Sequence, residues 1–128
     1  MRKQFFLFAA LFWTGVILFF CLENAQNIPQ INIPYIDKVI HAIFHFVFTT
    51  LWFLYFKKKF SSTYMIRVLS IAWIASLFFG IAIELIQEYV TTTRKADVID
   101  VLANTTGATF AVLLLMRMNA YNKIIDKI

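Results

Sequence analysis

Four long apolar runs, separated by short polar stretches, dominate the pattern of this chain. They cover about residues 5–22, 39–56, 68–89 and 98–116. Each run has about the 17–25 residues that an α-helix needs to cross the hydrocarbon core of a bilayer. None shows the strict alternation of a barrel strand, and only helices or closed barrels satisfy every backbone polar group within lipid. The pattern therefore predicts an all-α polytopic membrane protein, a bundle of four transmembrane helices.

The composition agrees with this class. Of the 128 residues, 61% are hydrophobic and only 15% are charged, and the mean hydropathy is +0.74. This is too apolar for a soluble chain of the same length. Because four membrane helices take up most of the 128 residues, no room is left for a separate soluble domain, and we expect a single membrane domain over residues 1–128. Arg2 and Lys3 before the first run would also fit a cleavable signal peptide. Since no small-x-small cleavage site follows them cleanly, we favour a membrane helix.

The basic residues predict the orientation of the bundle. If the four helices alternate in direction, nine of the twelve Lys and Arg residues fall on one side: Arg2, Lys3, Lys57, Lys58, Lys59, Arg67, Arg117, Lys123 and Lys127. By the positive-inside rule this side is cytoplasmic, and both termini lie there. The topology thus explains the net charge of +5, and we expect no nucleic-acid partner.

The acidic residues gather toward the opposite, outer side, where three of the helices each carry a polar stripe. Residues three, four or seven positions apart share one face of a helix. The stripes consist of Asp37, His41 and His45 on the second helix, Glu84, Gln87 and Glu88 on the third, and Asp97, Asp100 and Asn104 on the fourth. The three stripes are at similar depth, so we expect their side chains to meet.

Glu84 is the residue of these stripes that is hardest to explain as ordinary surface. It lies about six residues, on the order of 9 Å, inside the end of its run. A charge at the bilayer centre costs roughly 2.5–3.5 kcal/mol, and less near the interface. We therefore expect Glu84 to face the bundle and to have a partner, for which the candidates are His41, Arg94 and Asn104.

Several of the other polar residues have simpler interpretations. Asp97 immediately precedes the fourth apolar run and is best explained as the N-cap of that helix. Asp37 is either a first-turn residue stabilised by the helix dipole or part of a site. His45 fits a packing role, and Glu88 is close enough to the interface to be plain surface.

Three short motifs occur in order along the chain. They are Asp-Lys-x-x-His at residues 37–41, Glu-x-x-Gln at 84–87 and the segment RKADVIDVLANTTGA at 94–108. Together they resemble the signature of the VanZ-like proteins, which are small bacterial membrane proteins, over about residues 35–115. The family's motif positions correspond here to Asp37, Lys38, His41, Glu84, Gln87, Arg94, Asp100, Asn104 and Gly107.

The chain departs from the family pattern in three places. His45 stands where the family tends to carry an aromatic residue, so a His-x3-His metal pair would be peculiar to this chain. Thr92 and Thr93 replace the usual Pro-Gly turn before Arg94. Asp97 occupies a position that is often Ser, as expected for an N-cap.

The resemblance implies a cell-envelope protein of the bacterial cytoplasmic membrane. The family is named for a member associated with low-level resistance to teicoplanin, a glycopeptide that acts on lipid-linked cell-wall precursors outside this membrane. We expect an outward-facing polar pocket for an amphiphilic or lipid-linked ligand, with membrane lipids as partners and no metal or other cofactor. Its residues would be Asp37, Lys38, His41, Glu84, Gln87, Arg94, Asp100 and Asn104.

Two alternatives stay open. In the first, His41, Glu84 and Asp100 form an acid/base or metal-dependent site of a membrane-embedded enzyme acting on an envelope lipid. No nucleophile motif, His-Glu-x-x-His pattern or glycine-rich phosphate loop supports it. In the second, the polar residues are interhelical hydrogen-bonding groups of a structural subunit in a membrane complex. Such bonds average only about 0.6 kcal/mol, and the stripes contain more polar groups than this role needs.

Overall fold

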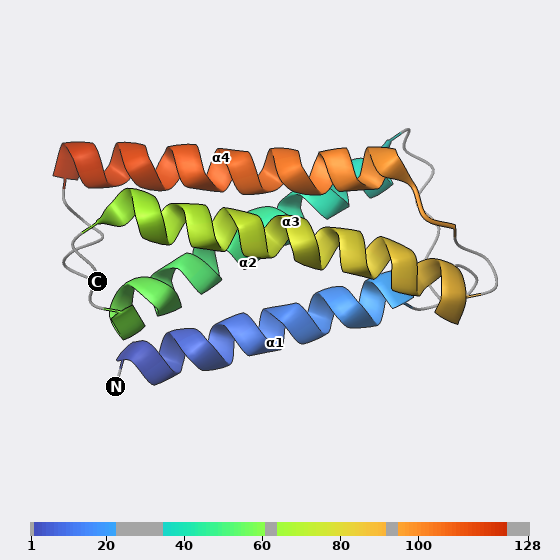
Figure 1. Cartoon of the computed structure of the whole chain (residues 1–128), viewed down its shortest axis with the longest axis horizontal. Helices are drawn as coiled ribbons and strands as arrows, with labels where there is room; N and C mark the ends of the chain where they lie inside the picture. The colour runs from blue at the N-terminus through green and yellow to red at the C-terminus, as the bar shows by residue number, and fades with distance from the viewer. Residues whose placement is uncertain (1, 23–34, 61–63, 92–94, 123–128) are drawn as a thin grey trace.

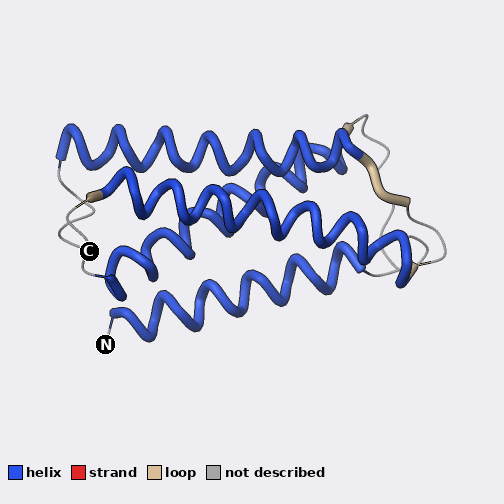
Figure 2. The backbone as a smooth tube through the Cα atoms, viewed as in Figure 1, coloured by secondary structure: helices blue, strands red, loops and turns tan. Residues whose placement is uncertain are grey.

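The described residues form four antiparallel helices (Figure 1). The computed structural model describes residues 2–22, 35–60, 64–91 and 95–122. The helices are α1 (Arg2–Leu22), α2 (Ile36–Phe60), α3 (Met65–Val90) and α4 (Val98–Asn122). The described residues contain no strand (Figure 2), so the predicted all-α class is confirmed.

All four helices are long and apolar enough to cross a membrane. Every helix extends beyond its predicted apolar run at one end or at both. In α2, for example, Lys57, Lys58 and Lys59 continue the last turn, because a helix does not end where the hydrocarbon ends. At 1.5 Å per residue a helix of this length is about 38 Å long, against a hydrocarbon core of about 30 Å. The chain is therefore a multi-pass membrane protein.

The helices alternate in direction, so two of them begin at each end of the bundle. The ends of α1 and α3 lie with the starts of α2 and α4 (Figure 1). We call this the outer end, after the orientation predicted from the basic residues. The start of α1 and the end of α4 lie together at the opposite, inner end, as the prediction for the two termini requires. Which end is cytoplasmic stays a prediction.

Helix α2 contacts each of the other three helices and packs most closely against α4. Gly107 permits this approach, because a Cβ atom added at Gly107 would overlap the backbone of Ala42. Toward the inner end, α2, α3 and α4 share an apolar core that includes Phe53, Leu69 and Leu115. A second apolar cluster joins α1 to α2 and α3.

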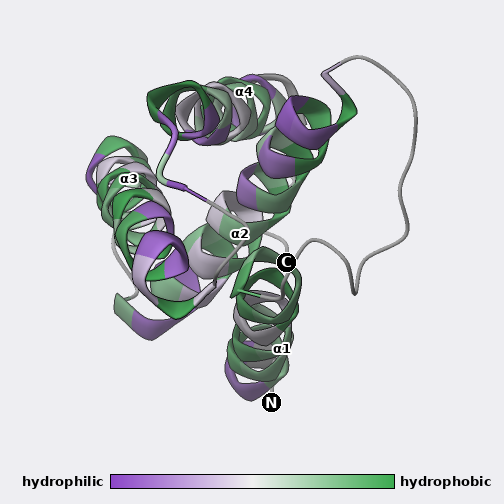
Figure 3. Ribbon diagram, turned by 90° about the vertical axis from the view of Figure 1, so that its right-hand side faces the viewer, coloured by the Kyte–Doolittle hydropathy of each residue, from purple (hydrophilic) through white to green (hydrophobic). Residues whose placement is uncertain are grey.

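The surface along the sides of the bundle is apolar. Large side chains such as Phe8, Phe12, Phe78 and Phe110 are exposed on it, and hydrophobic colouring covers much of the helices in the view onto the outer end (Figure 3). Hydrophilic turns gather where α2 and α4 begin and α3 ends (Figure 3). A polar region thus replaces the apolar core between these three helices at the outer end.

Candidate functional site

Lys38, near the start of α2, holds three carboxylates together at the outer end. Its Nζ atom lies 3.0 Å from Asp37, 2.9 Å from Asp97 and 2.5 Å from Asp100. An ammonium group has three N–H donors and no acceptor, so these three carboxylates match its whole capacity. The lysine thereby ties the start of α2 to the start of α4.

Asp97 joins this arrangement to α3. Its Oδ1 atom accepts a hydrogen bond from the backbone N–H of Ile99 at 2.9 Å, which confirms the predicted N-cap. Its own backbone N–H donates to Oε2 of Glu84 at 3.0 Å. The hydrogen bond from Lys38 lowers the pKa of the Asp97 carboxyl below its ordinary value, and the bond from Ile99 lowers the pKa further.

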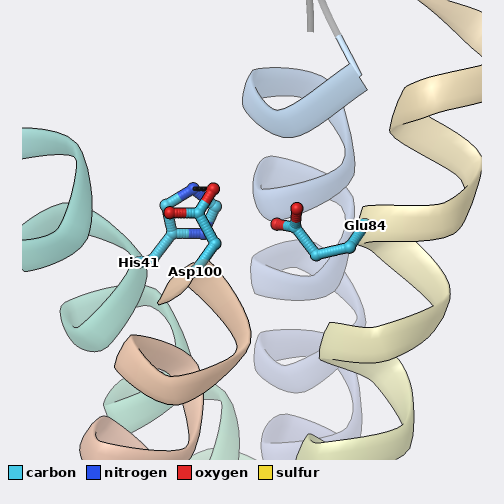
Figure 4. Close-up of side chains that lie close together, drawn as sticks. All are labelled: His41, Glu84 and Asp100. Carbon is cyan, nitrogen blue, oxygen red and sulfur yellow. Dashed lines mark ion pairs between the residues drawn. The ribbon is translucent and has the colours of Figure 1, made fainter. Parts of the chain in front are cut away.

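His41, Glu84 and Asp100 converge from α2, α3 and α4. All three are buried, with exposed fractions of 7%, 3% and 8%. One potential ligand atom of each lies within 4.8 Å of the others, and His41 Nε2 is 3.7 Å from Asp100 Oδ2. The carboxylate of Glu84 points from α3 toward the other two side chains (Figure 4). We call these residues the His41–Glu84–Asp100 cluster.

Three buried polar atoms beside Lys38 and its carboxylates have no hydrogen-bond partner among the described residues. They are Oε1 of Glu84 and both side-chain polar atoms of Asn104. Asn104 is 1% exposed and lies one helical turn after Asp100. It packs against Gly80, since a Cβ added there would be 2.9 Å from Asn104 Nδ2. Buried polar groups nearly always have a partner, so unpaired ones point to a ligand, ion or water that completes the site.

One predicted site residue, Gln87, makes its hydrogen bond outside this group. Gln87 is buried, but its Nε2 atom donates to the backbone carbonyl of Cys21 at 2.5 Å and so ties α3 to the end of α1. Arg94 lies outside the described residues, as do Thr92 and Thr93. Glu88 is exposed, in agreement with its interpretation as surface.

The polar stripe on α2 continues deeper than the predicted site. His45, interpreted as a packing residue, is 1% exposed and its Nδ1 atom lies 2.8 Å from Ser76 Oγ, within hydrogen-bond distance. One turn further, Thr49 is also fully buried. The i, i+4 and i+8 spacing of His41, His45 and Thr49 is the signal in the sequence for this column, whereas nothing there indicated Ser76 as a partner.

The chemistry available at the outer end follows from these groups. An imidazole and two carboxylates can transfer protons or hold a divalent cation. When all are ionised, the four carboxylates of Asp37, Glu84, Asp97 and Asp100 outnumber the one ammonium group, which contacts the three aspartates. The described part of the site is therefore rich in acceptors and negative charge.

A comparison with protein families identifies the chain. A family model described as VanZ/LLP1 matches residues 6–119. The match includes most of α1 and extends beyond the motif-bearing region, residues 35–115, at both ends. No curated protein and no solved structure matches the chain. Because the family model covers most of the sequence, the chain belongs to the VanZ/LLP1 family.

Proposed function

We propose that the outer-end polar site binds the head of an amphiphilic or lipid-linked ligand in the cell envelope of a bacterium. The observation that carries this proposal is Glu84, a carboxylate about 9 Å inside its helix with a 3% exposed fraction. Its Oε1 atom has no partner in the described part of the chain. A buried ionisable residue in a membrane helix is expensive and by default marks a functional site.

The free groups indicate which part of a ligand would bind. Lys38 is engaged by three carboxylates, which leaves Glu84 Oε1 as an acceptor, with the Asn104 amide beside His41 as a second polar group. A head group with hydroxyl or amine donors, such as a sugar or an amino alcohol, matches this set. If the head group also carries a negative charge, Arg94 or Lys95 would be the basic residues to contact it.

Native mass spectrometry of the full chain in mild detergent tests the proposal. We compare the wild type with Glu84→Gln and with Glu88→Gln, which makes the same change one helical turn away at an exposed position. The wild type and Glu88→Gln should retain a co-purified lipid or amphiphile that Glu84→Gln loses. A folded wild type without ligand, or equal retention in all three proteins, would contradict the proposal.

The resistance context implied by the family belongs to the same proposal. A protein that binds teicoplanin or its lipid-linked target would raise the teicoplanin concentration that a host strain tolerates. Expression of the wild type and of Glu88→Gln should raise this tolerance, and Glu84→Gln at the same membrane level should not. Unchanged tolerance in every strain would mean that this protein does not contribute to glycopeptide resistance. The proposed ligand site would then be tested by the mass-spectrometry comparison alone.

The convergence of one imidazole with two carboxylates favours a second candidate, a membrane-embedded enzyme that acts on an envelope lipid. His41 is the natural proton carrier of this group, because a neutral imidazole has one nitrogen that donates a proton and one that accepts it. Incubation of the purified protein with extracted bacterial lipids should then give a product that His41→Gln does not form. Ligand retention without any product would leave binding as the function.

A further inference from the structure

We propose that the His41–Glu84–Asp100 cluster binds one divalent transition-metal ion, with Zn²⁺ and Mn²⁺ as the best matches. The donor set of one imidazole nitrogen and two carboxylate oxygens suits these ions, because imidazole favours zinc and its neighbours while carboxylates accept both zinc and manganese. Each ligand comes from a different helix, so the ion would join α2, α3 and α4.

The distances are close to those of an occupied site. Two ligands bound to one zinc ion at about 2.0–2.2 Å lie about 3.3–3.6 Å apart in a tetrahedral site. His41 Nε2 and Asp100 Oδ2 are already 3.7 Å apart, and the ligand atoms of all three residues lie within 4.8 Å of one another. Binding of the ion would therefore draw the ligand atoms together by about 1 Å.

Both carboxylates are oriented through one oxygen and present the other to the cluster. Asp100 bonds to Lys38 through Oδ1, while Oδ2 faces His41 at 3.7 Å. Glu84 accepts the backbone N–H of Asp97 at Oε2, while Oε1 has no partner among the described residues. Outer hydrogen bonds of this kind orient the first ligands of metal sites.

The unpaired atoms distinguish this cluster from an ordinary group of acidic residues. Glu84 is 3% exposed, and its carboxylate points at His41 and Asp100 (Figure 4). Two buried carboxylates face each other here, and only Asp100 has Lys38 as a direct partner. Since buried charge without compensation is costly, a divalent cation would stabilise this arrangement.

The test measures metal on the full chain in mild detergent with no lipid added. The protein is stripped with a chelator and dialysed against Zn²⁺ or Mn²⁺, and bound metal is counted by elemental mass spectrometry. We expect about one ion per chain in the wild type and in Glu88→Gln. In Glu84→Gln and in His41→Ala the affinity should fall by at least about tenfold, because the loss of a group that only orients a metal ligand already costs about 10–100-fold. Substitution with Co²⁺ should give a visible absorption spectrum that both variants lose.

Two results would overturn the proposal: no saturable binding by the folded wild type, or unchanged affinity in both variants. Gel filtration and circular dichroism establish that each protein is folded. If Glu84→Gln fails this control, His41→Ala and the wild-type titration still decide. The metal and the proposed ligand would both use Glu84 Oε1, so metal is counted without lipid and ligand retention is measured after chelation. Metal binding and the proposed ligand site can then fail independently.

Discussion

Lys38 is the residue that organises the outer end. Its ammonium group reaches carboxylates on its own helix, in the segment before α4 and in the first turn of α4. The side chain is only 21% exposed, so water and salt screen these ion pairs less than pairs on an open surface. Without it, Asp97 and Asp100 would lie beside Asp37 with no shared counterion.

Replacing Lys38 should destabilise the protein. In Lys38→Met the bonds to Asp97 and Asp100 are lost, and the buried carboxylate of Asp100 is left without its ammonium partner. We expect the free energy of unfolding to fall by roughly 1–3 kcal/mol, measured by denaturant titration in detergent. The control Lys95→Met alters an exposed lysine of the same region and should change the free energy by less than about 0.5 kcal/mol. Equal effects would mean that the ion pairs contribute nothing to stability.

Residue spacing predicted which polar side chains share a face of one helix, but not which side chains of other helices they contact. The stripes correctly placed His41, Glu84 and Asp100 on faces that meet, because helical periodicity alone settles which residues share a face. Gln87 has the same kind of spacing, yet it bonds to Cys21. Which neighbour a side chain meets depends on the position of the next helix, and that position is a property of packing. The same holds for the pair of His45 with Ser76.

At the scale of elements, the contact of α2 with α4 determines the geometry of the site. These helices carry His41 and Asp100, and they approach most closely where Gly107 lies against Ala42. The apolar runs predicted that four helices exist. The sequence contains no signal that pairs Gly107 with Ala42, because that contact joins segments far apart in the chain.

Gly107→Ala should push α2 and α4 apart. The added methyl group would overlap the backbone of Ala42, and overpacking of this kind typically costs about 1–3 kcal/mol. We expect a lower unfolding temperature in detergent and weaker metal binding. Gly15→Ala provides the control, because nothing lies within 4 Å of the added atom and alanine favours helix. A Gly107→Ala protein as stable as the wild type would show that the helices adjust without cost.

For the whole molecule, the distribution of basic residues predicts which end faces the cytoplasm. Lysines end α2 at the inner end, while the buried carboxylates and Lys38 lie at the outer end. The site would then open toward the outer leaflet, where lipid-linked precursors are exposed. The antiparallel arrangement (Figure 1) makes a single measurement on each end sufficient to fix the topology.

Thiol labelling measures this orientation. In a background where Cys21→Ala removes the single cysteine, Lys59→Cys and Lys95→Cys each place a thiol at an exposed position on opposite ends. A membrane-impermeant maleimide should label Lys95→Cys in intact cells and Lys59→Cys only after permeabilisation. The reverse labelling pattern would mean that the bundle has the opposite orientation, with the site facing the cytoplasm.

The hydrogen bonds of Lys38 to Asp97 and Asp100 also bear on the order in which the site is assembled during synthesis. Its partners Asp97 and Asp100 follow it by 59 and 62 positions. A ribosome adds roughly 5–20 residues per second, so Lys38 is made roughly 3–12 s before these carboxylates exist. During that interval the growing chain contains only Asp37 of the three carboxylates. The site is therefore completed last, once α4 has been made and inserted.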